Sequence, residues 1–314
     1  MKKVVVTGIG AVTPLGNDVR TFWDSLVAGR SGAGPITHFN PALFKTRFAC
    51  EVRGFDPTPL LDRNELKRTD LFTQYALVAA AQAIDDSGLD IPSMDPFDIG
   101  VIFGSGQGGM ETFEQQVEEY AEGDGTPRFS PFFVPKLIAN MAPGLISMKY
   151  RLMGINYATV SACSTSNTAL MDALNYIRLG KAKVIVAGGS EAPVTAASIG
   201  GFNSMKALST RNDDPQGASR PFDVGRDGFV MGEGAGALIL EEYEHAKARG
   251  ARIYAELAGA AMTADAYHMT APHPEGAGAL RAMQDALADA EFPPGRASES
   301  HAAQSRAAGS RAGS

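Results

Sequence analysis

Short apolar runs alternate along the chain with longer stretches in which apolar residues recur at helical spacing. The short runs predict strands and the longer stretches predict helices. Predicted strands cover residues 4–6, 99–103, 155–162, 184–187, 235–240 and 252–257; predicted helices cover 19–28, 64–87, 110–122, 133–150, 169–177, a turn near Met205, and 242–249. This alternation predicts an α/β fold with a largely parallel sheet covered by helices.

The segment from Tyr157 to Asn167 contains a lone cysteine between a predicted buried strand and a predicted helix. Cys163 is therefore expected at a helix N-terminus, where unpaired N–H groups and the positive end of the dipole favour thiolate over thiol. Its small neighbours Ala162, Ser164 and Ser166 leave room for a substrate. Free cysteines are often small core residues. From the residues alone, Cys163 can be interpreted either as a nucleophile or as a core residue.

Composition limits the classes of protein that fit. The 314 residues are 44% hydrophobic and 20% charged, which suits one large or two medium domains with a substantial core. The net charge of −7 argues against general affinity for nucleic acid or anionic membrane. No run approaches the roughly 18 apolar residues of a membrane span. Two distant cysteines, Cys50 and Cys163, favour a reducing cytoplasm over a disulfide framework.

Other motifs give weaker signals. Gly8-Ile9-Gly10 follows a predicted strand, but Thr13 stands where a dinucleotide loop needs its third glycine, so a tight turn is predicted and no cofactor. His268 and His273 have no third ligand at suitable spacing, so no metal site is predicted. Cys50 lacks a following helix and is expected in the core.

Several long motifs occur in one order that resembles the β-ketoacyl-acyl carrier protein synthases, type II. S-A-C-S-T-S-N around Cys163 matches the nucleophile segment of this family. The other matching stretches are Val4 to Gly16, Ser130 to Pro135, Val186 to Ala192, Ala207 to Pro215, Ser219 to Asp223, Gly228 to Gly236 and Asp265 to Thr270. The resemblance favours the nucleophile reading of Cys163 over the core reading.

The resemblance implies a thiolase-like layered α/β fold with two similar halves. Residues 1–250 would form the N-terminal half with the nucleophile, and 251–292 the incomplete start of the second half. Near Phe292 the resemblance ends, and 293–314 contains no Val, Ile, Leu or Phe, so a disordered tail from a frame change or a foreign segment is expected. The family's N-A-H-G-T-S and later G-H motifs, which carry two active-site histidines, do not occur; His301 matches neither.

The resemblance also implies a reaction and a set of residues. Cys163 would accept an acyl group from acyl carrier protein, and malonyl-carrier protein would lose CO₂ to give an enolate that attacks the acyl-enzyme. No cofactor is implied, and condensation is expected to be defective without the two histidines. Acyl-pocket positions match Gln107, Phe133, Ala162 and Phe202, and carrier-docking positions match Lys67, Arg68 and Lys206.

The sequence therefore predicts a homodimeric, cytoplasmic acyltransferase of fatty-acid biosynthesis, derived from a condensing synthase. Two alternatives stay open. One is a non-catalytic dimerisation partner or inert fragment. The other is a ketosynthase subunit of a polyketide pathway, which would share the fold and motifs. The polar Gln107 stands where related enzymes usually carry an apolar gating residue, so the preferred acyl length is not predicted.

Overall fold

The computed structural model describes residues 1–291 and divides into two compact units, Met1–Ala255 and a second that begins at Glu256. Each unit is described by itself. The sheet except for Glu256, most of the helices and every residue predicted to act in catalysis or docking belong to the first unit. The tail expected over 293–314 lies outside the described residues.

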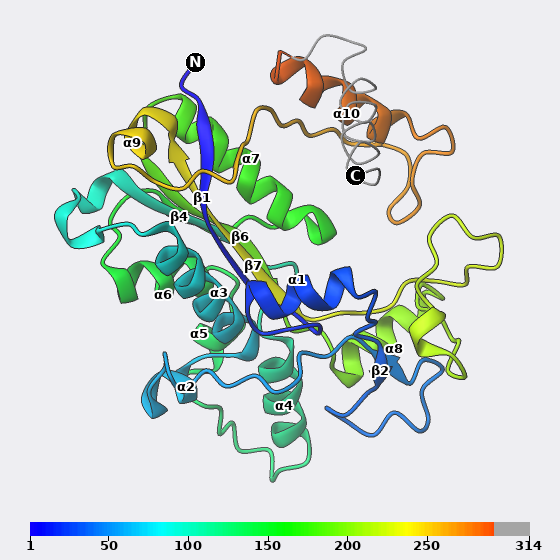
Figure 1. Cartoon of the computed structure of the whole chain (residues 1–314). Helices are drawn as coiled ribbons and strands as arrows, with labels where there is room; N and C mark the ends of the chain where they lie inside the picture. Colours follow the sequence, from blue (N-terminus) through cyan, green and yellow to red (C-terminus); the bar gives the residue numbers. More distant parts are fainter. Residues whose placement is uncertain (292–314) are drawn as a thin grey trace, which may run out of the picture. The chain divides into compact units, whose positions relative to one another are not determined.

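A six-stranded sheet forms the centre of the first unit (Figure 1). Its order is β5 (Asn156–Tyr157), β4 (Ile99–Gly104), β6 (Val184–Glu191), β7 (Gly234–Glu242), β1 (Val4–Val12) and β8 (Ala255–Glu256). β4 runs parallel to β5 and β6, whereas β7 runs antiparallel to both β6 and β1. The expected α/β class is confirmed. Because β7 is antiparallel to both of its neighbours, β1, β4, β5 and β6 run in one direction, and the predicted largely parallel sheet contains one reversed strand among these five. Two short strands, β2 (Gly34–Pro35) and β3 (Phe48–Ala49), form a separate pair.

Nine α-helices lie in the described part of the first unit. They are α1 (Val19–Val27), α2 (Arg63–Arg68), α3 (Leu71–Ser87), α4 (Met110–Ala121), α5 (Phe133–Leu137), α6 (Met141–Tyr150), α7 (Thr165–Arg178), α8 (Ala196–Ser204) and α9 (Tyr243–Ala248). The second unit contains α10 (Ala277–Asp289). No helix in the described residues is long and apolar enough to cross a membrane.

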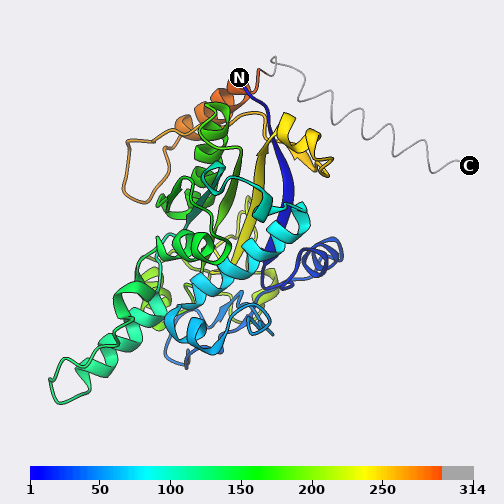
Figure 2. The ribbon, with the colours of Figure 1, turned by 90° about the vertical axis from the view of Figure 1, so that its left-hand side faces the viewer.

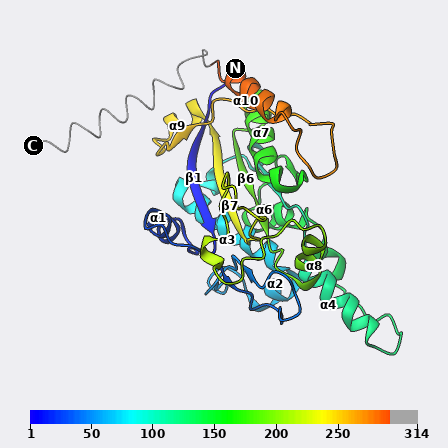
Figure 3. The same cartoon turned by 90° about the vertical axis from the view of Figure 1, so that its right-hand side faces the viewer.

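Helices α3 and α7 cover opposite faces of the sheet (Figures 2 and 3). Side chains added at Gly8 and Gly10 of β1 would overlap carbonyl oxygens of α3, and a side chain at Gly189 of β6 would overlap Ser166 of α7. Gly189 pairs with Gly236, which pairs with Ala11, so these three residues point to one face and Gly10 points to the other. The sheet therefore separates the two helices.

Gly8-Ile9-Gly10 does not form the predicted tight turn, because it continues β1. The two glycines allow α3 to pack directly against the strand backbone. A Cβ on Gly8 would overlap the Ala83 carbonyl oxygen, and a Cβ on Gly10 would overlap the Ala79 carbonyl oxygen. Around α3 the core includes the large buried side chains Phe72, Tyr75, Phe103 and Ile146. Glycine here permits close helix–strand packing rather than an unusual backbone angle.

Two long predicted helices are each broken in the structure. The helix predicted over 64–87 stops at Arg68, and α3 begins after Asp70, whose carboxylate accepts the Phe72 N–H at 3.3 Å. The same carboxylate accepts the N–H and hydroxyl of Thr112 in the first turn of α4. The helix predicted over 133–150 is interrupted between α5 and α6. Hydrophobic spacing continues across such breaks, so the pattern did not reveal them.

We expect Gly10→Ala to lower the free energy of unfolding by at least about 2 kcal/mol, because its Cβ would push α3 away from β1. Gly236→Ala is the matched control, since it lies on the neighbouring strand with no atom within 4 Å of the added carbon. Its effect should stay within about 0.5 kcal/mol. Urea unfolding followed by circular dichroism measures both, and equal losses would contradict this account of the packing.

Candidate active site

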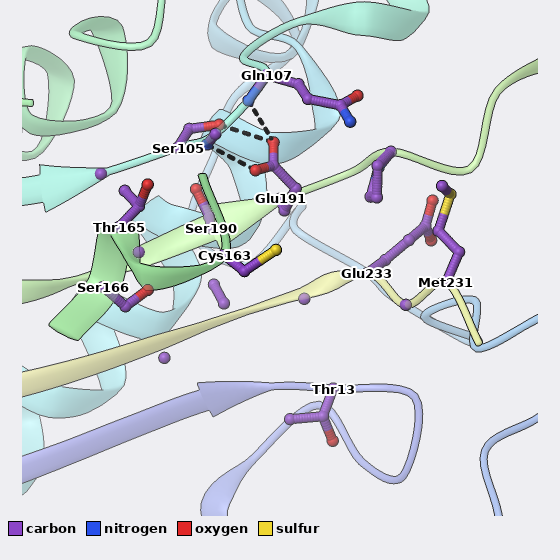
Figure 4. A pocket seen from close by; sticks show the side chains of 18 of the residues that line it. Thr13, Ser105, Gln107, Cys163, Thr165, Ser166, Ser190, Glu191, Met231 and Glu233 are labelled. Carbon is purple, nitrogen blue, oxygen red and sulfur yellow. Dashed lines mark hydrogen bonds between the residues drawn. The ribbon is translucent and has the colours of Figure 1, made fainter. Parts of the chain in front are cut away.

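Cys163 lies in a single 3₁₀ turn, Ala162–Ser164, that leads directly into α7. The predicted helix after the cysteine is confirmed. The strand predicted over 155–162 is present but much shorter and not buried: β5 covers only Asn156–Tyr157, and Val160 is 67% exposed. An irregular segment instead brings the chain to the helix. Cys163 is exposed, and Figure 4 shows its sulfur pointing into a pocket.

A cavity of about 720 Å³ opens beside Cys163. This volume is in the ordinary range for a small-molecule site. The walls come from the ends of β1, β4, β6 and β7, where polar and small residues replace the strand core, and from three phenylalanines. Lining segments are 11–14, 104–107, 162–163, 165–166, 189–191 and 231–236, with Phe22, Pro193, Phe202 and Phe229.

Three of the four predicted acyl-pocket residues lie together with Cys163 in this wall. Gln107, Ala162 and Phe202 line the cavity. Phe202 packs edge-on against Phe229, with ring centroids 5.3 Å apart. The Gln107 side chain is held by Ser198, whose hydroxyl donates to Oε1 at 3.0 Å. This hydrogen bond ties the Gln107 side chain to α8.

The fourth, Phe133, is not among the residues that line the described cavity. It stacks on Phe113 and Phe129, and Phe129 in turn contacts Tyr120. We call these four residues the aromatic cluster. It lies on α4, α5 and the segment between them, and Figure 3 shows α4 extending away from the sheet.

Glu191 is a site residue that the sequence reasoning missed. Its carboxylate accepts the Ser105 hydroxyl at 2.9 Å, the Gly106 N–H at 2.6 Å and the Gln107 N–H at 3.2 Å (Figure 4). Burial raises the pKa of Glu191, while these hydrogen bonds oppose the rise. The end of β6 therefore fixes the turn that carries Gln107. In the sequence, the only indication that Glu191 belongs to the site was its position just after the V-A-G-G residues of the predicted strand.

Glu233 is a second carboxyl in the cavity wall that was missed. Burial raises its pKa to about 7, and the nearby His38 imidazole, with Nδ1 3.4 Å from Oε1, opposes that rise. Val52 N–H donates to Oε2 at 3.2 Å, and the Tyr75 hydroxyl lies 3.4 Å from the same oxygen. The cavity wall therefore includes a carboxyl whose pKa is raised by burial. The G-E-G-A-G motif contains this residue, but nothing in the motif indicates its burial.

The predicted docking residues lie outside the cavity. Lys67 and Arg68 occupy the last turn of α2, and the Arg68 guanidinium lies 5.3 Å from the Phe132 ring centroid. Lys206 comes two residues after the end of α8 and has a left-handed φ of 55°. The views agree that α2 and α8 lie toward the same end of the sheet (Figures 1 and 3). In the described residues no group of three or more His, Cys, Asp or Glu side chains could hold a metal ion.

Comparison with solved structures identifies the fold class of this chain. The chain superimposes on a β-ketoacyl synthase from Burkholderia phymatum with a TM-score of 0.83 and 35% identity, covering 93% of this chain and 71% of that one. A type II polyketide ketosynthase, AntDE, solved in complex with its acyl-carrier protein AntF, gives a TM-score of 0.82 and 34% identity over the same shares. The fold is that of the thiolase-like condensing enzymes.

Sequence comparisons identify the family. Residues 1–246 match the beta-ketoacyl synthase N-terminal domain, and residues 254–306 match the corresponding C-terminal domain. The second match continues past Phe292, where the resemblance was expected to end. The chain is 50% identical to 3-oxoacyl-[acyl-carrier-protein] synthase 2 of Synechocystis sp. and 48% identical to that of Coxiella burnetii, covering 93–94% of this chain and 70–71% of the relatives. The chain belongs to the β-ketoacyl synthase family, whose members are condensing acyltransferases.

We expect limiting iodoacetamide at neutral pH to label Cys163 at least about tenfold faster than Cys50. Cys163 is exposed, whereas Cys50 is only partly exposed and burial raises the pKa of its thiol, so less thiolate is present at neutral pH. Peptide mass spectrometry of the folded protein measures both rates, with Cys163→Ala as control. Preferential labelling of Cys50 would refute the assignment.

Proposed function

We propose that this chain is a 3-oxoacyl-acyl carrier protein synthase of the fatty-acid type, with Cys163 as the residue that accepts the acyl group. One observation carries the proposal: Cys163 is exposed to a cavity of about 720 Å³ at the start of a helix. The identity of 48–50% to synthases of this type, over nearly the whole chain, supports the same reading.

The first half of the reaction is acyl transfer to Cys163. The thiolate attacks the thioester carbonyl of the acyl-carrier protein, a bond forms between this carbon and the Cys163 sulfur, the bond to the carrier sulfur breaks, and the carrier leaves as a thiolate that takes a proton from water. Negative charge gathers on the carbonyl oxygen in the transition state. The Cys163 N–H, at the start of α7, is one donor for this oxygen, and the helix dipole adds to its effect. The acyl chain then lies along the apolar wall near Phe202 and Phe229.

The second half is decarboxylative condensation. Malonyl-carrier protein loses CO₂, the resulting enolate carbon bonds to the acyl carbonyl, and the Cys163 sulfur leaves. Charge develops on the malonyl thioester oxygen, so donors must face that atom. In the described part of the chain, the cavity lining includes no His, Lys or Arg. We therefore propose that the described cavity supports acyl transfer to Cys163, and that efficient condensation needs donors beyond those that line it.

A polyketide role is the second candidate, and specific neighbours support it. The ishigamide ketosynthase/chain length factor and AntDE share the fold. Their identities of 33–34% are lower than the 48–50% found for the fatty-acid synthases, so we favour the fatty-acid reading.

We further propose that an acyl carrier protein docks on Lys67, Arg68 and Lys206. These three basic side chains would form a local positive surface that attracts an acidic partner. They stand out because the net charge of the chain is −7. The structure of AntDE with its acyl-carrier protein is one precedent among the structural neighbours.

We also propose that the chain forms a homodimer in the cytoplasm. The aromatic cluster, with Phe113 and Tyr120 each more than 40% exposed, continues into Val117 and Val134. A contiguous apolar surface of this kind usually meets a partner. A second copy of this chain would cover it, and two cysteines that form no disulfide suit a reducing compartment.

We expect this chain to be acylated at Cys163 and to catalyse condensation only slowly. Incubation with octanoyl-acyl carrier protein should add one acyl group to Cys163, detected by intact-protein mass spectrometry and absent in Cys163→Ala. Adding malonyl-acyl carrier protein should give product at least about 10²–10³-fold more slowly than a relative that carries both family histidines, because oxyanion donors of this kind contribute that factor. Condensation at the relative's rate would contradict the proposal. A folded protein that takes no acyl group would favour the non-catalytic partner.

Arg68→Glu should weaken binding of acyl carrier protein about fivefold or more at low ionic strength, and added salt should shrink the difference, because charge steering is screened. Arg20→Glu on α1 makes the same change of charge away from α2 and serves as the control. Fluorescence titration at two salt concentrations measures both variants. Equal affinities for the two would remove Arg68 from the docking surface.

A further inference from the structure

The residue before the nucleophile has an unusual backbone conformation. Ala162 has φ of 50°, in the left-handed region that residues with a Cβ seldom occupy. Such a conformation persists only where the surrounding structure holds it. Ala162 is joined directly to Cys163. The contacts that fix the backbone of Ala162 therefore also fix the orientation of Cys163.

The hydroxyl of Thr165 bonds the backbone on both sides of this point. Its Oγ1 accepts the Ser161 N–H at 2.9 Å and donates to the Ala162 carbonyl oxygen at 2.7 Å. The same carbonyl also receives the Thr165 backbone N–H. One side chain therefore closes a ring around the Ser161–Ala162 segment, using a donor and an acceptor at once.

The Thr165 side chain is itself held in place. It is buried, and its methyl group faces Gly104 at the end of β4, since a Cβ on Gly104 would overlap Thr165 Cγ2. Thr159 donates its hydroxyl to the Thr165 carbonyl oxygen at 3.0 Å. A β-branched residue with its methyl fixed has little freedom about χ1, so the hydroxyl must point toward the loop. Figure 4 shows Thr165 at the start of α7, next to Cys163.

We propose that Thr165 is a positioning residue for the nucleophile: its hydroxyl holds Ala162 in the left-handed conformation and so directs Cys163 into the cavity. The proposal rests on Cys163 being the nucleophile of the proposed function. Thr165 acts through the backbone of Ser161 and Ala162 and takes no proton from the cysteine. Without the hydroxyl, Ala162 would relax to an ordinary φ and Cys163 would turn away from the cavity and the helix start.

The test measures the rate of Cys163 alkylation by iodoacetamide in the full chain, which needs no acyl transfer. Thr165→Val keeps the shape but removes both hydrogen bonds, and should slow alkylation about tenfold. Thr165→Ser keeps the hydroxyl and should stay within about twofold of the unchanged chain. Thr168→Val is the matched control: Thr168 bonds Ser161 Oγ and the Ser164 carbonyl in the same loop but does not touch Ala162. It too should stay within about twofold.

Repeating the measurement in an Ala162→Gly variant distinguishes a positioning role of Thr165 from a general loss of structure. Glycine adopts the left-handed region without penalty. In an Ala162→Gly background, the slowing caused by Thr165→Val should therefore fall from about tenfold to below about threefold. An undiminished slowing, or equal slowing by Thr165→Val and Thr168→Val, would overturn the proposal.

One measurement needs no variant. The Ser161 amide should exchange with deuterium much more slowly than the neighbouring exposed amides, because Thr165 Oγ1 accepts it. Rapid exchange at Ser161 would overturn the proposal even if Thr165→Val failed to fold. If alkylation follows the expected order but no acyl group transfers from carrier protein, the proposed function fails while the role of Thr165 stands.

Discussion

The close contact of α7 with the sheet determines where the nucleophile lies. Gly104 on β4 and Gly189 on β6 present bare backbone to the first turn of α7, against Thr165 and Ser166. Side chains at either glycine would push the helix outward by the width of a methyl group or more. Because Cys163 is joined to that turn, its distance from the cavity wall is fixed by atoms that take no part in chemistry.

The cavity wall combines apolar surface with two carboxyls, the half-buried Glu191 and the buried Glu233. Glu191 accepts hydrogen bonds from the turn at Ser105–Gln107 and keeps one wall in shape. Glu233 lies among His38, Tyr75 and the Val52 N–H, with its pKa raised by burial to about 7. Hydrogen bonds from neighbouring backbone N–H groups oppose the effect of burial on the pKa of both carboxyls. Both side chains therefore tie the cavity wall to neighbouring backbone.

The sequence alone predicted the strands at the centre of the sheet, the helix after Cys163 and the grouping of Gln107, Ala162 and Phe202 around it. Local pattern and family motifs contain this information. Antiparallel pairing of β7, the break at Asp70, the contacts of Glu191 and the burial of Glu233 depend on residues far apart in the chain. Hydrophobic spacing does not record such contacts, and the left-handed Ala162 depends on a hydroxyl that no propensity scale weighs.

Asp70 has a mechanical consequence beyond starting a helix. Its carboxylate bonds the first turns of both α3 and α4, so the base of α4 is fastened to the buried core helix. From that anchor α4 extends for 12 residues, roughly 18 Å at the rise of an α-helix. Further along α4, Glu114 accepts the Ala197 N–H of α8 at 2.8 Å and Gln116 accepts the Ser130 N–H of the segment before α5 at 2.7 Å, so three separate parts of the chain set the direction in which α4 leaves the core.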